Sequence, residues 1–392
     1  MIDVIIPVYG GVEQTRRCID SVLSHNQAAA HEVVVIDDAS PDPAITAYLD
    51  ELAGQGRISL HRNDSNLGFV RSVNRGMALH GDRDVVLLNS DTEVANDWLD
   101  RLRAAACSAP HVATATPFSN NATICSYPFE GWGRGVPGTL GLARLDRLFA
   151  TANAGRTLEL PTAIGFCMYI RRECLDQLGL FDAERFGRGY GEENDFCMRA
   201  LKAGWRHVLA ADVFLYHEGS VSFSGERFEL IKAATAALLA VHPEYTNRVH
   251  EFIKADPAAE LRAAVDNARV AFGAEEARHV LAEHAEERRR LVNSMWEIDR
   301  LTAERETLTA ERESLAGQVN QLNYAVDHAM NVLADRDRVI AKGEDQIAQL
   351  RAGLAHAESL AFSRQAELEA LRSNLLIRLY ERVRRRLVRS RP

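Results

Sequence analysis

The sequence predicts an α/β domain followed by a long α-helical coiled coil. In the first part of the chain, short apolar runs such as DVIIPV, EVVVIDDAS and DVVLLNSD alternate with segments of helical spacing. That alternation is typical of a mostly parallel sheet packed against helices. In the last part, from Ile298 to Leu375, apolar residues recur in one heptad register, which is the pattern of a coiled coil.

The composition indicates an acidic body with a basic end. The net charge is −9, and residues 377–392 contain seven Arg and one Glu, so that segment carries about +6 and the remainder about −15. The acidic body gives no reason to expect a nucleic-acid partner. The six cysteines are scattered without a CxxC pair, which favours buried thiols in a reducing compartment. The N-terminus lacks the basic start of a signal peptide, and we expect a cytoplasmic protein.

Polar residues follow the apolar runs of the first domain, in PVYGG, DDAS and NSDTE. Ligands of α/β sheets bind at the carboxyl ends of the strands. Asp37, Asp38 and Asp91 lie at such ends, and Arg71 lies at a predicted helix start, where backbone N–H groups favour anions. Taken singly, each also fits a helix cap or a turn. Together they supply the acid, the cation and the metal ligand that a nucleotide donor requires.

The domain boundaries follow from changes in composition. Residues 117–160 are rich in Gly, Pro, Asn and aromatic residues and are expected to form long loops over a site. A second strand–helix block follows, and we place the end of the α/β domain at residue 255. We expect a helical linker over 256–290, a coiled coil over 291–376 and a basic amphipathic tail over 377–392.

The heptad seam is apolar at most of its a and d positions, with Ile298 at a and Leu301 at d. The exceptions are Arg305, Arg312, Arg336, Gly343 and Arg364. One unbroken register predicts a single long helix that joins copies of the chain into a homo-oligomer. The alternatives are a lone solvated helix and a helix that folds back at Gly343.

The sequence also contains an acidic turn, GRGYGEENDFCMR (residues 187–199), in which Glu192, Glu193 and Asp195 lie within four positions. Acidic residues in the first turn of a helix are favoured by its dipole, which explains part of the cluster. The flanking glycines suit a backbone that passes close to a ligand. A carboxylate there could accept a proton as a general base.

These motifs, in this order, resemble the family 2 inverting glycosyltransferases, which have the GT-A fold, a Rossmann-like mixed sheet that binds nucleotide sugars. The resemblance covers about residues 1–250. It is carried by IIPVYG, VVVIDDAS, RNDSNLGFVRSVNRG, LLNSDTEV, AIGFCMYIRRE, LGLFDAERFGRGYGEENDFCMR and YHEGSVS. The forms NLGF and LNSDT are similar to bacterial enzymes that build surface polysaccharides such as O-antigens, including rhamnosyltransferases.

The resemblance implies a role for each matching position. It implies nucleotide-sugar binding by Pro7, Val8, Tyr9, Asp38, Arg71, Asn89, Ser90 and Gly165. It implies that Asp91 and His217 lie at a Mg²⁺ or Mn²⁺ ion, with Asn89 and Asp91 in the family's Asp-x-Asp place. It implies that Glu193 is the base that activates an acceptor hydroxyl, with Asp195 as the alternative and Glu192 in support. Glu193 departs from the family's Asp by one methylene group.

The basic tail, LLIRLYERVRRRLVRSRP, alternates apolar residues with Arg at helical spacing. Such a segment is typical of a membrane-surface anchor, and it is also compatible with a solubilising end or a nucleic-acid patch. We expect a peripheral protein on the inner face of the bacterial plasma membrane that transfers sugar from a nucleoside-diphosphate donor to a glycan or lipid-linked glycan.

Two other functions are compatible with parts of the sequence. A coiled-coil scaffold whose α/β domain binds nucleotide sugar without catalysis would share the fold, but the near-complete site motifs favour an enzyme. A nucleotide-sugar pyrophosphorylase would need a Gly-rich, basic phosphate loop near the N-terminus, and IPVYGGVEQTRR lacks that form.

Overall fold

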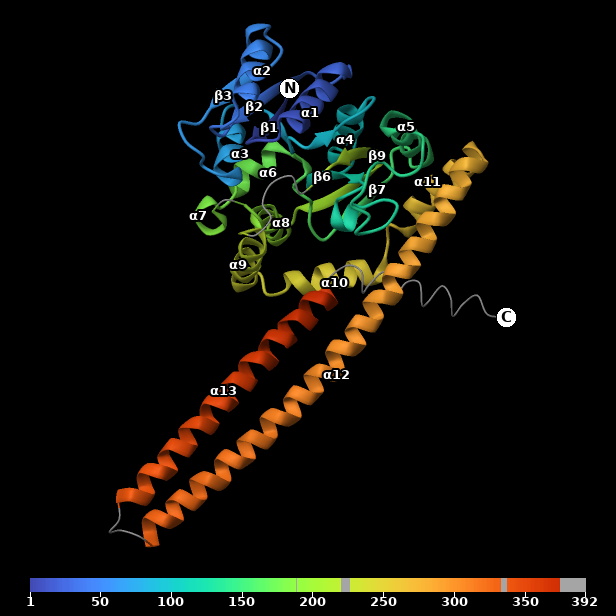
Figure 1. Cartoon of the computed structure of the whole chain (residues 1–392). Coiled ribbons are helices and arrows are strands. Elements are labelled where there is room, and N and C mark those ends of the chain that lie inside the picture. Colours follow the sequence, from blue (N-terminus) through green and yellow to red (C-terminus); the bar gives the residue numbers. More distant parts are fainter. Residues whose placement is uncertain (188, 220–225, 333–336, 374–392) are drawn as a thin grey trace. The chain divides into compact units, whose positions relative to one another are not determined.

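A computed structural model describes the chain except for residues 188, 220–225, 333–336 and 374–392 (Figure 1). The chain divides into two compact units, the first from Met1 to Glu287 and the second from Arg288 onward. The first unit is a mixed β-sheet with packed helices, and the second is helical. This confirms the predicted class, an α/β domain with a mixed sheet followed by a long helical region.

The sheet has the strand order β3-β2-β1-β4-β8-β6-β9-β5 in the described residues, and β7 pairs with β9. The strands are β1 (Ile2–Val8), β2 (His31–Asp37), β3 (Ser59–Arg62), β4 (Asp84–Leu88), β5 (Thr92–Glu93), β6 (Val112–Ser119), β7 (Thr157–Leu160), β8 (Cys167–Ile170) and β9 (Arg206–His217). Strands β1 to β4 are parallel, β8 runs against β4 and β6, and β9 runs parallel to β6. The carboxyl ends of β1, β2, β4 and β9 therefore meet the start of β8 at one edge.

Helices connect the strands and bury an apolar stripe against the sheet. In the first unit they are α1 (Val12–Ser24), α2 (Pro43–Gly54), α3 (Phe69–Met77), α4 (Trp98–Ala106), α5 (Leu142–Ala152), α6 (Arg172–Leu178), α7 (Ala183–Phe186), α8 (Glu192–Lys202), α9 (Glu226–Val241), α10 (Tyr245–Ala255) and α11 (Ala259–Phe272). Helix α3 is an example of such an apolar stripe. Its residues Val70, Val73 and Met77 are spaced three and four apart and lie in one buried core cluster with Ile5 of β1.

The first unit extends further than the sequence predicts. Of the helical linker expected over 256–290, the residues up to 287 form α11 and the start of α12 (Ala274–Val332) and belong to this unit. The physical reason is a buried ionic network. Arg269 of α11 is fully buried and donates hydrogen bonds to Glu276 (2.9 Å), to Glu283 (2.6 and 2.9 Å) and to Tyr127 Oη (3.0 Å). Glu276 in turn accepts from the backbone N–H and the hydroxyl of Thr139.

The second unit contains two long helices rather than one. Helix α12 ends at Val332, and α13 (Asp337–Ser373) runs back beside it (Figure 1). An ion pair between Arg364 and Glu304 (3.3 Å) joins the two helices. Gly343, where the sequence suggested a possible reversal, lies inside α13.

Part of the predicted heptad seam is buried in this helix pair. Leu301 and Val319 of α12 and Ile347, Ala357 and Leu368 of α13 are all buried, and all occupy a or d positions of the register. The apolar repeat is therefore covered, at these positions, within one chain. In the part of the chain that the structure describes, no helix is both long and apolar enough to cross a bilayer. The predicted basic tail, 377–392, lies outside the described residues.

Candidate active site

The ends of β1 and β2 form the first part of the candidate site. Pro7 and Val8 are buried, so among the three residues predicted at the end of β1 only Tyr9, 42% exposed, presents its side chain at the surface. The carbonyl of Val8 accepts a hydrogen bond from the backbone N–H of Asp38 (2.9 Å). This bond holds the two predicted nucleotide-binding segments side by side at the sheet edge.

Asp38 organises the loop that leads into α3. Its Oδ1 accepts from Asn63 Nδ2 (2.7 Å) and from the backbone N–H of Leu67 (2.8 Å), and its Oδ2 accepts from the backbone N–H of Gly68 (2.8 Å). The carboxylate therefore shapes the NLGF loop directly. Arg71 follows in the first turn of α3, is exposed, and makes no hydrogen bond or ion pair with the described residues. Its guanidinium is available to a solvent anion.

Asp91 and His217 come together although they lie far apart in the sequence. Strand β5 pairs with the end of β9, and this pairing sets Thr92 opposite His217. Asp91 Oδ1 lies 3.4 Å from His217 Nε2, and Asp91 Oδ2 accepts from the backbone N–H of Gly219 (3.1 Å). Burial acts to raise the pKa of Asp91, but the hydrogen bond and charge of His217 and the backbone N–H groups outweigh it, so this pKa is below its ordinary value.

The imidazole of His217 has a defined orientation. Its Nδ1 lies 2.7 Å from the carbonyl oxygen of Asn121; because a carbonyl only accepts, Nδ1 carries a proton. Nε2 faces Asp91: it donates to this carboxylate when the ring is an imidazolium, and it offers a lone pair to a cation when the ring is neutral. The ring stacks on Phe166 with centroids 5.1 Å apart, and Asn120 holds the His217 backbone through both its N–H and its carbonyl. A ligating histidine whose other nitrogen donates to a carbonyl is the usual arrangement at metals. One carboxylate and one such imidazole fit a Mn²⁺ or Mg²⁺ ion that takes its other ligands from phosphate and water.

Gly219 is required for this geometry. Its φ is +66°, and a Cβ at this position would lie 2.0 Å from Asn121 Nδ2. Only glycine allows the backbone N–H to reach Asp91 while Asn121 reaches His217.

The loop before β8 connects the metal candidate to the acidic turn. The backbone N–H of Asn89 donates to the Phe166 carbonyl (2.8 Å), which brings the NSD segment, with Ser90, to the AIGF segment. A Cβ on Gly165 would lie 3.6 Å from Glu193 Cγ, so the Glu193 side chain packs against Gly165. Glu193 and His217 are thus in contact with two consecutive residues, Gly165 and Phe166.

Glu192 and Glu193 form a buried carboxyl pair at the start of α8. The Oε2 atoms of both residues are buried without a hydrogen-bond partner among the described residues. Burial raises the pKa of Glu193. Burial, followed by the charge of Glu193 and the hydrogen bond between the two carboxyls, raises the pKa of Glu192 well above its ordinary value. Glu192 therefore retains a proton at a pH where an exposed glutamate is ionised, and Glu193 carries the charge of the pair.

Asp195 differs from the expectation. Its Oδ2 accepts from Arg199 Nε (2.8 Å), and its Oδ1 lies 2.9 Å from Nε2 of the buried His242. The first contact lies within α8, and the second joins α8 to the segment before α10, so both oxygens of this buried carboxylate are used. The alternative base predicted from the sequence is thus engaged in a structural ion-pair network.

Neutral polar residues around the site were missed by sequence reasoning. They are Asn120, Asn121, Asn194, Thr162 and Tyr245, together with Phe166. A polar pair directly after a strand, as in FSNNAT, is a signal that could have identified Asn120 and Asn121. Asn194 and Tyr245 have no such signal, because their contacts depend on how α10 packs.

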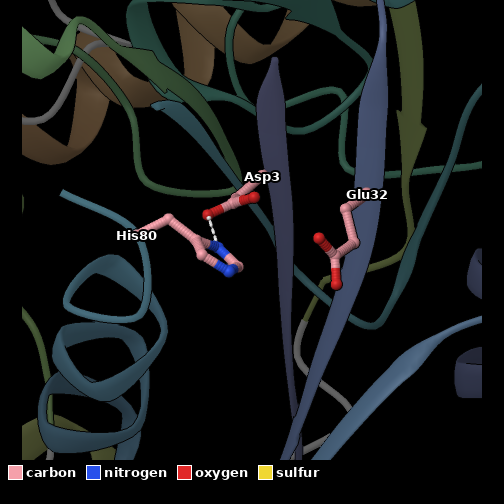
Figure 2. Close-up of side chains that lie close together, drawn as sticks. All are labelled: Asp3, Glu32 and His80. Atoms are coloured by element: carbon pink, nitrogen blue, oxygen red, sulfur yellow. Dashed lines mark hydrogen bonds and ion pairs between the residues drawn. The ribbon is translucent and has the colours of Figure 1, made fainter. Parts of the chain in front are cut away.

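A second acidic group lies elsewhere in the first unit. Asp3, Glu32 and His80 present ligand atoms within 4.8 Å of one another, and His80 bonds to Asp3, with Glu32 on the neighbouring strand (Figure 2). Arg83 Nη1 donates to Asp3 (2.9 Å) and to Glu32 (2.6 Å), so a guanidinium already neutralises both acids. The group lies at the starts of β1 and β2, away from the ends that carry the candidate site, and we assign no metal to it.

Curated relatives match part of the chain. The Sinorhizobium fredii protein named Uncharacterized protein y4gI is 24% identical over 235 residues, which are 57% of this chain and 25% of the relative. Polypeptide N-acetylgalactosaminyltransferase 16 of Mus musculus is 22% identical over 197 residues, 48% of this chain and 34% of the relative. The chain thus spans about a third or less of the length of these relatives.

Solved structures of low similarity also match. A structure of GalNAc-T7 with UDP, GalNAc and Mn²⁺ has a TM-score of 0.46 and 19% identity over 68% of this chain and 54% of that chain. The mannosyltransferase PcManGT of Pyrobaculum calidifontis, in complex with GDP-Man and Mn²⁺, has a TM-score of 0.43 and 18% identity over 73% of this chain and 79% of that chain.

The sequence of the first unit also matches a family model. Residues 3–179, which contain the ends of β1, β2 and β4 and the loop before β8, match the model described as Glycosyl transferase family 2. Residues 3–179 of this chain are therefore similar to glycosyltransferase family 2 domains.

Proposed function

We propose that the protein is an inverting glycosyltransferase that moves a sugar from a nucleoside-diphosphate donor to an acceptor hydroxyl. The family match over residues 3–179 supports sugar transfer. One observation carries the proposal for the site: Glu193 packs against Gly165, and Phe166, the next residue, stacks on His217, which faces Asp91. A proton acceptor and a metal-ligand pair are thereby held by one short loop.

Glu193 acts as the general base in this proposal. The acceptor O–H proton passes to a Glu193 carboxylate oxygen as the acceptor oxygen forms a bond to the anomeric carbon. The bond from that carbon to the diphosphate oxygen breaks, and the nucleoside diphosphate leaves with the electron pair. Because the new bond forms on the face opposite the leaving group, the anomeric configuration inverts. The pKa of Glu193, raised by burial, makes it a stronger base than an exposed glutamate.

Asp91 and His217 are the residues that would hold a divalent cation, through Oδ1 and Nε2. Such an ion supplies positive charge that stabilises a departing diphosphate. Arg71, exposed in the first turn of α3, adds a cation next to the backbone N–H groups of that turn. Tyr9 and the loop shaped by Asp38 form the side of the site proposed for the nucleoside.

The sequence also supports a proposed acceptor, a membrane attachment and an oligomeric state. The acceptor is a glycan or lipid-linked glycan of bacterial cell-surface polysaccharide synthesis, as the O-antigen-type motifs suggest. Residues 377–392 attach the protein to the membrane surface. The homo-oligomer predicted from the heptads requires that the α12–α13 pair associates with a second pair, because seam residues such as Leu301 and Leu368 are already buried within one chain.

The test of the function is a screen of UDP-, GDP- and dTDP-sugars with Mn²⁺, in which release of the nucleoside diphosphate is measured. Asp91→Asn keeps the size of the side chain and removes its charge; Asp97→Asn, at an exposed aspartate beside the same strand, is the matched control. We expect turnover of at least one donor, lost in Asp91→Asn and retained in Asp97→Asn.

The competing function is a scaffold that binds nucleotide sugar without turning it over. Donor binding in calorimetry, together with no release from any sugar of the screen, would favour the scaffold and contradict the enzyme. The Glu192–Glu193 pair argues against the scaffold. Two buried carboxyl groups, each with one oxygen lacking a hydrogen-bond partner among the described residues, destabilise the fold, and such perturbed acids are typical of catalytic sites.

A further inference from the structure

We propose that Asn194 is a positioning residue for the base: it fixes one oxygen of Glu193, so that the other oxygen is presented to the acceptor hydroxyl. The inference depends on the proposed function of Glu193 and adds a residue that the resemblance does not assign. It also gives α10, which lies beyond the family-matched residues 3–179, a role in catalysis.

The contacts form a short chain from α10 to the base. Asn194 Nδ2 donates to Glu193 Oε1 (3.1 Å). Asn194 Oδ1 accepts from Tyr245 Oη of α10 (2.8 Å) and from Thr162 Oγ1 (3.0 Å) of the segment before Gly165. The carboxylate of Glu193 can only accept, so the amide NH₂ of Asn194 must face it and the amide oxygen must face the two hydroxyls.

This arrangement divides the two oxygens of Glu193. Oε1 is held by the Asn194 amide, whereas Oε2 is buried without a partner among the described residues. A buried acceptor atom without a partner is costly unless a ligand completes it. Oε2 is therefore the atom we assign to the acceptor hydroxyl, and the Asn194 contact keeps the side chain rotated so that Oε2 remains available.

The next residue of α8, Asp195, also contacts the region around the start of α10. Asp195 bonds to His242, three residues before Tyr245. Two successive residues of α8, Asn194 and Asp195, are thus held by Tyr245, the first residue of α10, and by His242 of the segment before it. Helix α10 and this segment would therefore determine the orientation of the α8 N-terminus, where the base lies.

The Asn194 amide also affects the charge of the base. A donor to the ionised form lowers the pKa of a carboxyl, and Asn194 opposes the effect of burial on Glu193. The titratable groups that act on the same carboxyl pair are Glu192 and Cys197 on α8, with Tyr245 of α10 one hydrogen bond away. Loss of the amide donor should therefore raise the pKa of Glu193.

Asn194→Asp is the discriminating variant. It keeps an oxygen for Tyr245 and Thr162 and replaces the donor to Glu193 by an acceptor, so a merely structural role of Asn194 would be largely preserved. Tyr245→Phe removes the support of the amide, and Tyr48→Phe is its control, because Tyr48 Oη donates to Asp20 at the same distance of 2.8 Å on α1.

Two measurements test the proposal on the full chain. Carbon-13 NMR of glutamate-labelled protein, with Glu193→Gln to identify the resonance, follows the titration of Glu193 without any substrate. The pH profile of kcat is recorded with whichever nucleotide sugar of the screen turns over fastest, with Mn²⁺ present.

In Asn194→Asp we expect the titration midpoint and the acidic limb of the profile to move to higher pH by about one pH unit, with kcat near neutral pH lower by about tenfold. We expect a smaller change of the same sign in Tyr245→Phe and none in Tyr48→Phe. A wild-type titration midpoint in Asn194→Asp would overturn the inference. If Glu193→Gln retained full turnover, the proposed base would be wrong, while the NMR titration would still decide whether Asn194 controls this carboxyl.

Discussion

The buried arginine of α11 provides a sharp test of how the first unit is held together. In Arg269→Met the aliphatic stem remains and the guanidinium is removed. The wild-type guanidinium contacts the carboxylates of Glu276 and Glu283 and the hydroxyl of Tyr127, and both acids are nearly inaccessible to water. The substitution would leave two buried carboxylates without their cation.

The magnitude follows from that geometry. Removal of one partner from a buried ion pair costs about 3–5 kcal/mol, mainly through the uncompensated charge. Thr139 still donates to Glu276, through its N–H and its hydroxyl, so we expect a value within this range rather than above it. Such a loss is a large fraction of the stability of a typical domain, about 5–15 kcal/mol.

The assay is equilibrium urea unfolding followed by tryptophan fluorescence. Arg156→Met is the matched control, since Arg156 pairs with Glu260 at 3.9 Å and both side chains are substantially exposed; an exposed pair is worth about 0–1 kcal/mol. The triple variant Arg269→Met/Glu276→Gln/Glu283→Gln should recover part of the loss, because it removes the stranded charges. Equal destabilisation by Arg269→Met and Arg156→Met would refute the reasoning.

Two further predictions concern the site. His217→Ala should weaken Mn²⁺ binding in calorimetry by at least the about 10–100-fold that loss of an outer-shell partner of a metal ligand costs; unchanged affinity would remove His217 from the metal site. Burial raises the pKa of Glu192 in the folded state above its unfolded value, so folding favours the protonated side chain. The stability that protonated Glu192 contributes is fully present below the unfolded pKa, and it is lost as the pH rises toward the folded pKa. Glu192→Gln should therefore match wild type in thermal unfolding near pH 4 and exceed it near pH 8, and a lower melting temperature than wild type at pH 8 would contradict the buried, protonated state.

The strands and the edge that carries the site could be predicted from the sequence. Apolar runs that end in DDAS and NSDTE indicate strands of a parallel sheet, and in the structure β2 and β4 flank β1 with these ends together. The pairing of Asp91 with His217 could not be derived from spacing, because it depends on the short β5 strand that pairs with β9. The family resemblance supplied His217 as a candidate.

The parts that the sequence did not predict depend on long-range packing. Charged residues such as Arg269 and Glu283 are seldom buried unless they are paired, and the sequence does not show that they meet each other and Glu276. A heptad register describes which face of a helix is covered, and it is equally compatible with a partner from another chain or from the same chain. The α12–α13 pair uses the second possibility at Leu301, Val319 and Ile347.

The central claim is that Glu193 accepts the proton of the acceptor hydroxyl. The most direct measurement compares the rate of sugar transfer in Glu193→Gln with that in Glu184→Gln, an exposed acid on α7 in the same acidic region. We expect transfer to fall by about 10²–10⁴-fold in Glu193→Gln, with donor and Mn²⁺ affinity retained, and to be unchanged in Glu184→Gln. Wild-type transfer by Glu193→Gln would contradict the account.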